Sequence, residues 1–157
     1  MQKKIFITKS AEETQKIAKS LVRKIKNGGV LALYGDLGSG KTTFTQGLAK
    51  ELGIKRIISP TFIIIRSYKI KNHPFGKLRA KIKNTIKNSK IFYHIDLYRV
   101  ERVTDVNNLG IEEIFENPQN IIVIEWAEKM KELLPKKRID IYFEYLEENK
   151  RKIEIMR

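Results

Sequence analysis

The chain has 157 residues, about the length of one domain, and its 32 lysines and arginines against 18 acidic residues give a formal net charge of +14. The absence of cysteine excludes disulfides, thiolate metal sites and cysteine nucleophiles, and two histidines alone argue against a histidine-built zinc site. No apolar run approaches the roughly 18 residues that a membrane span needs, and the opening "MQKKIFITKSAEE" lacks the apolar stretch of a signal peptide. We therefore expect one cytoplasmic domain over residues 1–157 that makes no membrane contact.

The first elements are predicted by local patterns. "KKIFIT" (3–8) alternates and predicts a short strand. Ser10, with Glu13 three residues later, forms a capping-box pattern that opens a helix with an apolar stripe. Residues 27–29, Asn-Gly-Gly, are expected to end this helix because they tolerate the left-handed conformation of a C-terminal cap.

The rest of the chain predicts buried strands separated by helices. Val30–Tyr34 is apolar on both faces, as expected of a central strand covered by helices on each side. Further strands are predicted from about residue 62, over 91–96 and over 120–126, and helices over 42–52, in parts of 97–117 and over 128–134. The tail alternates on either side of Glu147–Asn149 and predicts a β-hairpin. This order predicts a three-layer α/β fold with a mainly parallel, mixed sheet.

The positive charge is concentrated between Arg66 and Lys90, where nine lysines and arginines occur without an acidic residue. Within this segment, residues 71–90 look like a basic insertion, with a loop at its start and helical character from 78 to 86. Clustered cations are typical of surfaces that bind nucleic-acid phosphates. The alternative is a solvated insertion in a chain whose lysine-, isoleucine- and asparagine-rich composition reflects a genome-wide bias.

"GDLGSGKT", residues 35–42, fits the pattern G-x-x-x-x-G-K-[ST] in full and lies between an apolar strand and a helix. Its glycines allow backbone N–H groups to converge on a phosphate, and the helix N-terminus adds a partial positive charge. Lys41 is expected to reach the β- and γ-phosphates, and Thr42 to bind Mg²⁺. The loop residues expected to bind the nucleotide are Gly35, Asp36, Gly38, Ser39 and Gly40. A P-loop NTPase fold is therefore predicted.

A magnesium–nucleotide site also needs an acid, and two buried strands each end in one. Asp96 ends "IFYHID" and Glu125 ends "IIVIE", so both are expected at the sheet edge where ligands bind in open α/β folds. Asp96 is the preferred metal-linked acid, and Glu125 is a candidate for orienting the attacking water or holding the metal through a water. Thr61 in "SPTF" is a candidate γ-phosphate sensor, with a simple turn hydroxyl as the alternative. Trp126 either packs in the core or shields the nucleotide.

Three function classes follow from these residues. The D-x-x-G and N-K-x-D patterns of GTPases do not occur. Three functions remain possible for the chain: an ATPase, a small-molecule kinase with the basic segment as its lid, and a nucleic-acid-binding module that uses that segment.

Five motifs in order, "GDLGSGKTTFTQGL", "SPTF", "YHIDLYR", "LGIEEIF" and "IEWAE", resemble the bacterial TsaE family over nearly the whole chain. The resemblance implies a P-loop fold that binds ATP and Mg²⁺ and supports formation of threonylcarbamoyladenosine beside the tRNA anticodon. It also implies weak ATP hydrolysis alone and action together with the TsaB–TsaD pair, which makes contact with tRNA indirect.

The resemblance also assigns residues. Lys41, Thr42 and Thr43 match the end of the family's P-loop, Asp96 its Walker-B-like acid, and Glu125 with Trp126 its Glu-Trp pair. The metal role is extended to Glu125, because the family pattern does not separate the two acids. Thr14 and the hairpin around Lys150-Arg151 are weaker candidates for the adenosine end. The basic insertion departs from the family pattern and is a candidate contact with tRNA or the partner subunits.

Overall fold

The computed structural model describes residues 2–57, 64–70, 90–107 and 109–157. Thr61 and residues 71–89 of the basic insertion lie outside the described residues, so the expectations for them stay predictions. The strands are β1 (Lys3–Thr8), β2 (Gly29–Tyr34), β3 (Ile65–Lys69), β4 (Ile91–Asp96), β5 (Ile121–Glu125), β6 (Ile139–Glu147) and β7 (Lys150–Met156). The helices are α1 (Ala11–Ile25), α2 (Lys41–Glu51), α3 (Val103–Asn107), α4 (Ile111–Glu116) and the 3₁₀ helix η2 (Ala127–Leu133).

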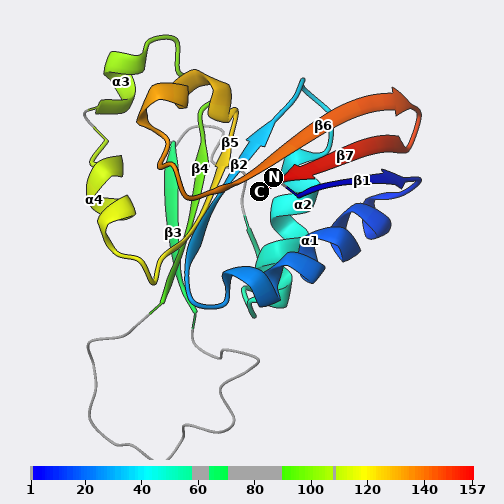
Figure 1. Cartoon of the computed structure of the whole chain (residues 1–157), viewed down its shortest axis with the longest axis horizontal. Helices are drawn as coiled ribbons and strands as arrows, with labels where there is room; N and C mark the ends of the chain where they lie inside the picture. Colours follow the sequence, from blue (N-terminus) through cyan, green and yellow to red (C-terminus); the bar gives the residue numbers. More distant parts are fainter. Residues whose placement is uncertain (1, 58–63, 71–89, 108) are drawn as a thin grey trace, which may run out of the picture.

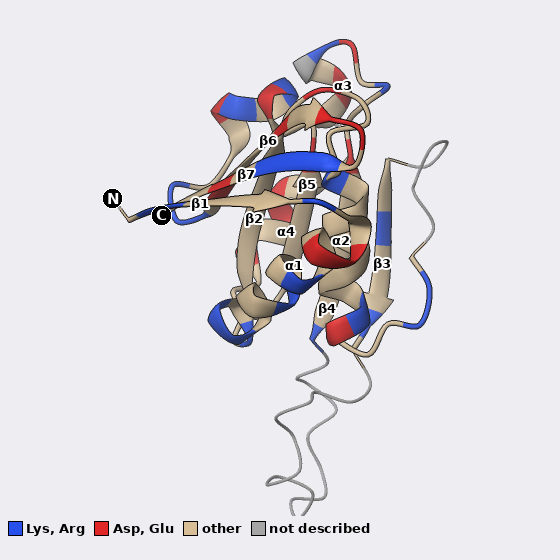
Figure 2. Cartoon of the chain, turned by 90° about the vertical axis from the view of Figure 1, so that its right-hand side faces the viewer, with Lys and Arg blue, Asp and Glu red and all other residues tan. Residues whose placement is uncertain are grey.

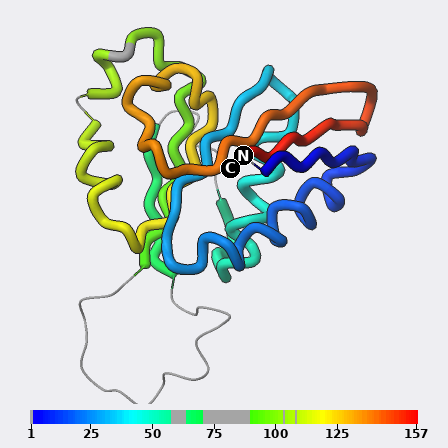
Figure 3. Tube along the Cα trace, viewed as in Figure 1, coloured from blue at the N-terminus to red at the C-terminus, as the bar shows by residue number. Residues whose placement is uncertain are grey.

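The described strands form one seven-stranded sheet in the order β1-β7-β6-β2-β5-β4-β3 (Figure 1). The pairs β2–β5, β2–β6 and β4–β5 are parallel, whereas β1–β7, β6–β7 and β3–β4 are antiparallel. The expectation of a mainly parallel sheet therefore holds only in the middle. The predicted C-terminal hairpin is confirmed as β6 and β7, and β7 lies beside β1, so the two chain ends meet (Figure 3).

Helices cover both faces, which confirms the three layers. Helices α1 and α2 pack on one face, over a core that includes Leu21, Leu31, Leu48, Val123 and Ile153. Helices α3 and α4 and η2 lie on the opposite side (Figure 1), over a second core that includes Ala32, Ile95, Ile111, Ile124 and Met130. The middle strands are apolar on both faces because both faces are covered.

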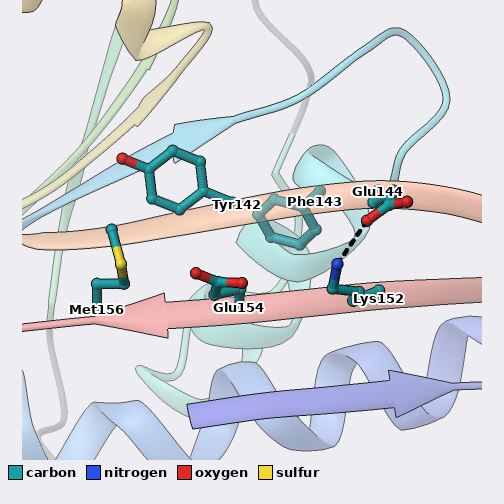
Figure 4. Close-up of a pocket in the computed structure, with 6 residues that line it drawn as sticks. All are labelled: Tyr142, Phe143, Glu144, Lys152, Glu154 and Met156. Carbon is teal, nitrogen blue, oxygen red and sulfur yellow. Dashed lines mark hydrogen bonds and ion pairs between the residues drawn. The ribbon is translucent and has the colours of Figure 1, made fainter. Parts of the chain in front are cut away.

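Among the described elements, the helices on the second face cover its middle strands, because they follow β4 and β5 directly in the chain. Over β1, β7 and β6, side chains on this face stay exposed: Ile5 is 52 % and Tyr142 38 % exposed. A shallow cavity with a volume of about 350 Å³ lies over β6 and β7 (Figure 4), where Lys152 pairs with Glu144 at 2.8 Å. This cavity lies over the outer strands, whereas the predicted nucleotide residues cluster at the ends of the middle ones.

Helix α1 begins at the predicted N-cap. The Ser10 Oγ accepts a hydrogen bond from the Glu13 backbone N–H at 3.2 Å. The Glu13 carboxylate accepts from the backbone N–H of Lys9 at 2.7 Å, one residue before the N-cap donor that a capping box would use. The predicted capping pattern is thus realised in part.

Helix α2 approaches α1 closely at Gly47. A Cβ added there would lie 2.6 Å from the Gln15 Cα and 2.9 Å from the Gln15 backbone oxygen. In a solvent-exposed helix, replacing glycine by alanine stabilises the helix by about 1 kcal/mol. Here we expect a loss of about 1–3 kcal/mol, because the added methyl overpacks the contact between the two backbones.

Thermal unfolding followed by circular dichroism measures the sign of this effect. Gln46→Ala, on the exposed side of the same helix, is the matched control and should change stability by less than about 0.5 kcal/mol. A higher Tm for Gly47→Ala would contradict the close helix contact.

Candidate functional site

The site lies where β2, β5 and β4 end, around residues 35–40, hereafter the glycine-rich loop. Gly35, Gly38 and Gly40 have φ of 133°, 76° and 105°, all in the left-handed region that favours glycine. A Cβ at Gly35 would lie 2.3 Å from the Phe143 backbone oxygen on β6. The loop conformation therefore requires glycine, as the motif predicted, and the hairpin strand β6 supports it.

The loop leads into α2 with its N-terminal donors free of side-chain caps. The N-cap is Gly40, and no side-chain hydrogen bond caps the helix among the described residues. The first turn of a helix leaves backbone N–H groups without intrahelical partners, and these attract anions. The Ser39 Oγ is also buried and finds no hydrogen-bond partner in the described part of the chain. These donors suit a phosphate.

Lys41 lies beneath the loop. Its Nζ donates to the Gly35 oxygen at 2.5 Å and to the Asp36 oxygen at 2.8 Å, and it lies 3.9 Å from the ring centroid of Trp126. Burial lowers the pKa of Lys41, and the carboxylates of Glu125, Glu128, Asp96 and Asp36 oppose this shift in part. An ammonium with three N–H groups keeps one donor beyond its two carbonyl partners.

Glu125 is the centre of a buried hydrogen-bond network and is only 1 % exposed. Its Oε2 accepts from the Thr42 hydroxyl at 2.7 Å, and its Oε1 from the Thr45 hydroxyl at 3.0 Å. His94 Nε2 lies 2.8 Å from the same Oε1. Burial raises the pKa of Glu125, but the hydrogen bond and charge of His94 and the two threonine hydroxyls outweigh it, so the pKa is below its ordinary value. The network therefore holds a carboxylate anion.

Asp96 and Glu125 are register partners across the parallel pair of β4 and β5, so both predicted acids reach the same edge of the sheet. The Asp96 Oδ1 accepts from the backbone N–H of Tyr98 at 3.1 Å, and the side chain is half-buried. The Thr42 hydroxyl contacts Glu125 directly. Hydroxyl and carboxylate oxygens are hard ligands of the kind Mg²⁺ prefers.

The residues described at this site would supply only part of a metal coordination sphere. In residues 2–57, 64–70, 90–107 and 109–157, no three histidine, cysteine, aspartate or glutamate side chains group as a metal site. Mg²⁺ is usually bound by one or two carboxylates together with phosphates and waters. The oxygens of Thr42, Asp96 and Glu125 fit that arrangement.

Trp126 lies at the rim of this site rather than deep in the core. Its φ of 60° and ψ of 43° are left-handed, which is unusual for a residue other than glycine. Its ring packs 5.2 Å from that of Tyr98 and covers Lys41, with Lys129 Nζ 5.8 Å away. Backbone strain of this kind often accompanies function. The shielding position favours the nucleotide interpretation, although the indole also touches the second core.

A second contact of the hairpin with the glycine-rich loop comes from Arg151 on β7. Arg151 Nε donates to the Gly38 oxygen at 3.2 Å, and its guanidinium lies 4.3 Å from the Tyr145 ring. Figure 2 shows this basic stretch of β7. Lys150 instead pairs with Glu147 on the surface, and the Thr14 hydroxyl, 3.0 Å from that of Thr8, is buried. Of these weaker candidates, Arg151 is the one with a described contact to the loop.

Two members of the site, His94 and Thr45, were not among the residues predicted from the sequence. His94 is the polar residue inside the otherwise apolar strand before Asp96, which was a usable signal. Thr45 lies three residues after Thr42 and so on the same helix face. Both contact Glu125 from different elements, which only the folded chain reveals.

In the described part of the chain, no helix has the length and apolar character needed to cross a membrane.

Comparisons with known proteins identify relatives over nearly the whole chain. A tRNA threonylcarbamoyladenosine biosynthesis protein TsaE from Bacillus subtilis is 40% identical over 147 residues, covering 93% of this chain and 80% of the relative. Its counterpart from Rickettsia felis is 36% identical over 149 residues, covering 94% and 76%.

A solved structure and a family model agree with these relatives. The crystal structure of Bacillus subtilis YdiB matches with a TM-score of 0.72 and 33% identity, covering 98% of this chain and 84% of that one. The family model described as threonylcarbamoyl adenosine biosynthesis protein TsaE matches residues 8–153. The chain therefore belongs to the TsaE family.

Proposed function

We propose that this chain is a single P-loop ATPase domain that serves threonylcarbamoyladenosine formation in tRNA. The observation that carries the proposal is the hydrogen bond of 2.7 Å between Thr42, in the first turn of α2, and the buried Glu125. It joins the end of the glycine-rich loop to an acid at the edge of the sheet. The role in threonylcarbamoyladenosine formation is inferred from the names of the relatives. The partnership with TsaB and TsaD is inferred from the family resemblance.

The proposed roles follow from the contacts. The loop amides and Lys41 bind the phosphates and stabilise negative charge as the γ-phosphoryl group leaves. The Thr42 hydroxyl donates a hydrogen bond to Glu125, so the lone pairs of the Thr42 oxygen are available to a cation. Thr42 and Asp96 would hold Mg²⁺, which supplies charge neutralisation at the phosphates, and Glu125 would either join them as a ligand or orient the attacking water. Trp126 shields the phosphate end from solvent.

The proposal is tested by phosphate release from ATP with the chain alone and with TsaB and TsaD from a relative. We expect Mg²⁺-dependent release of inorganic phosphate that increases with the partners and needs no phosphate acceptor. A phosphorylated small metabolite without inorganic phosphate would identify a kinase instead. Neither product, together with no ATP binding by calorimetry, would refute the ATPase proposal.

Trp126 is the only tryptophan, so intrinsic fluorescence reports directly on this site. Because its ring lies 3.9 Å from the Lys41 Nζ, a phosphate that approaches this ammonium must change the surroundings of the indole. We expect a saturable change in emission on titration with ATP and Mg²⁺, with a midpoint equal to the calorimetric Kd. Trp126→Phe should remove the signal. Unchanged emission at ATP concentrations that saturate the calorimetric signal would contradict the shielding role.

A further inference from the structure

His94 is a fully buried polar residue that the proposed chemistry does not use. It is 0% exposed on β4, among apolar neighbours such as Phe92 and Ile95. Its Nδ1 is buried without a partner among the described residues. The contact of Nε2 with Glu125 is therefore the hydrogen bond that this ring makes among the described residues. A buried polar group is costly unless it is hydrogen-bonded, so this contact needs an explanation.

The direction of the contact follows from chemistry. Both oxygens of Glu125 already accept hydroxyl hydrogen bonds, Oε2 from Thr42 and Oε1 from Thr45, so the carboxylate accepts and the tautomer that completes the contact has its proton on His94 Nε2. The second donor to Oε1, the Thr45 hydroxyl, has another acceptor within reach. The Thr45 hydroxyl has one proton and lies 3.0 Å both from Glu125 Oε1 and from the Lys41 backbone oxygen. His94 is therefore the dedicated donor to Oε1.

The two oxygens of Glu125 face different parts of the molecule. Oε1 faces His94 and Thr45 in the interior, and Oε2 faces Thr42 at the start of α2. Glutamate has several rotatable bonds, so a fixed donor at one oxygen restricts where the other can lie. The contact with His94 comes from β4, the strand that also ends in Asp96, so it ties the two acid-bearing strands together.

We propose that His94 is a positioning residue, which holds Glu125 so that its Oε2 stays on Thr42 and faces the phosphate end of the site. The inference rests on the proposed ATPase function. A simple fold-stabilising pair would make the same hydrogen bond, so the test must separate the two roles. Partners that orient a functional carboxylate or ligand from outside typically change activity or metal affinity by about 10–100-fold when removed.

The test compares His94→Phe, which keeps an aromatic ring without a donor, with His94→Gln, which keeps an N–H donor near the position of Nε2. Both are assayed for ATP affinity by calorimetry and for kcat and KM with TsaB and TsaD. We expect His94→Phe to lower kcat by about 10–100-fold with ATP affinity changed less than about threefold. His94→Gln should recover most of the rate. In the Glu125→Gln background, His94→Phe should have little additional effect, because both act through one carboxylate.

A stabilising role alone predicts another pattern. It lowers Tm for His94→Phe but leaves kcat at the wild-type value, and this result would overturn the inference. Equal loss of rate in His94→Phe and His94→Gln would overturn it too. A wild-type chain that binds no ATP would refute the proposed function itself, and calorimetry on the wild type distinguishes that failure from failure of the positioning role.

The ring proton can also be observed without any nucleotide. The chain has only two histidines, so long-range ¹H–¹⁵N spectra contain two ring systems, and His73→Gln assigns them. We expect the His94 proton on Nε2 in the wild-type chain. A ring protonated only on Nδ1 would contradict the hydrogen bond, and this measurement remains available even if His94→Phe fails to fold.

Discussion

Lys41→Ala should lower kcat for ATP hydrolysis by about 10²- to 10³-fold, the scale seen when one charge-stabilising donor is removed. The expected loss has two physical causes. The ammonium that would neutralise developing charge is gone, and the carbonyl oxygens of Gly35 and Asp36 lose the donor that now holds them at 2.5 and 2.8 Å. Because these carbonyls shape the loop, ATP affinity should fall as well. Calorimetry and phosphate release with TsaB and TsaD measure the two effects separately.

Lys129→Ala is the matched control for this variant. Lys129 also lies against the indole of Trp126, at 5.8 Å, but donates to the Val100 oxygen at 2.8 Å rather than to the glycine-rich loop. Its removal deletes a lysine beside the same ring, so we expect lower Tm with kcat within about threefold of wild type. Full activity of Lys41→Ala would refute the ATPase proposal. Equal losses in both variants would indicate that the position of Trp126, rather than the Lys41 charge, limits the reaction.

The parts of the fold predicted from sequence are those specified by neighbours in the chain. Ser10 begins α1 because its hydroxyl accepts a hydrogen bond from a backbone N–H three residues later. The loop formed by "GDLGSGKT" has positive φ angles at its three glycines, which the glycines themselves indicate. The hairpin is local too, since β6 ends at Glu147 and β7 begins at Lys150. Strand ends also placed Asp96 and Glu125 at one edge, because both strands point the same way.

What sequence could not provide is long-range pairing. Strand β1 pairs with β7 from the other end of the chain, and alternating residues do not encode which strand lies alongside or in which direction. The same reason hid the His94–Glu125 contact, which depends on the register of β4 against β5. The Arg151 contact with Gly38 likewise depends on where the hairpin joins the sheet.

Glu125→Gln should lower kcat by about 10²- to 10⁴-fold, the range for loss of a group that activates the attacking water. Glutamine keeps the shape but only one of the two acceptor oxygens. An amide NH₂ in the place of Oε1 meets the His94 donor at 2.8 Å, and one in the place of Oε2 has a partner only if the Thr42 hydroxyl, at 2.7 Å, turns to accept instead of donating. We expect a further cost of about 1–3 kcal/mol in stability from the weakened network, measurable as a lower Tm.

Calorimetry then separates the two roles open to Glu125, with Glu128→Gln as the control. Glu128 also acts on the Lys41 charge, but it is exposed, so the same substitution there should leave kcat within about twofold. If Glu125→Gln binds ATP and Mg²⁺ with near wild-type affinity, the carboxylate acts on the water. If affinity falls only when Mg²⁺ is present, it acts on the metal, since a ligand to the cation contributes to binding before any chemistry occurs. Unchanged kcat would assign the buried network to stability alone and leave Asp96 as the acid of the site.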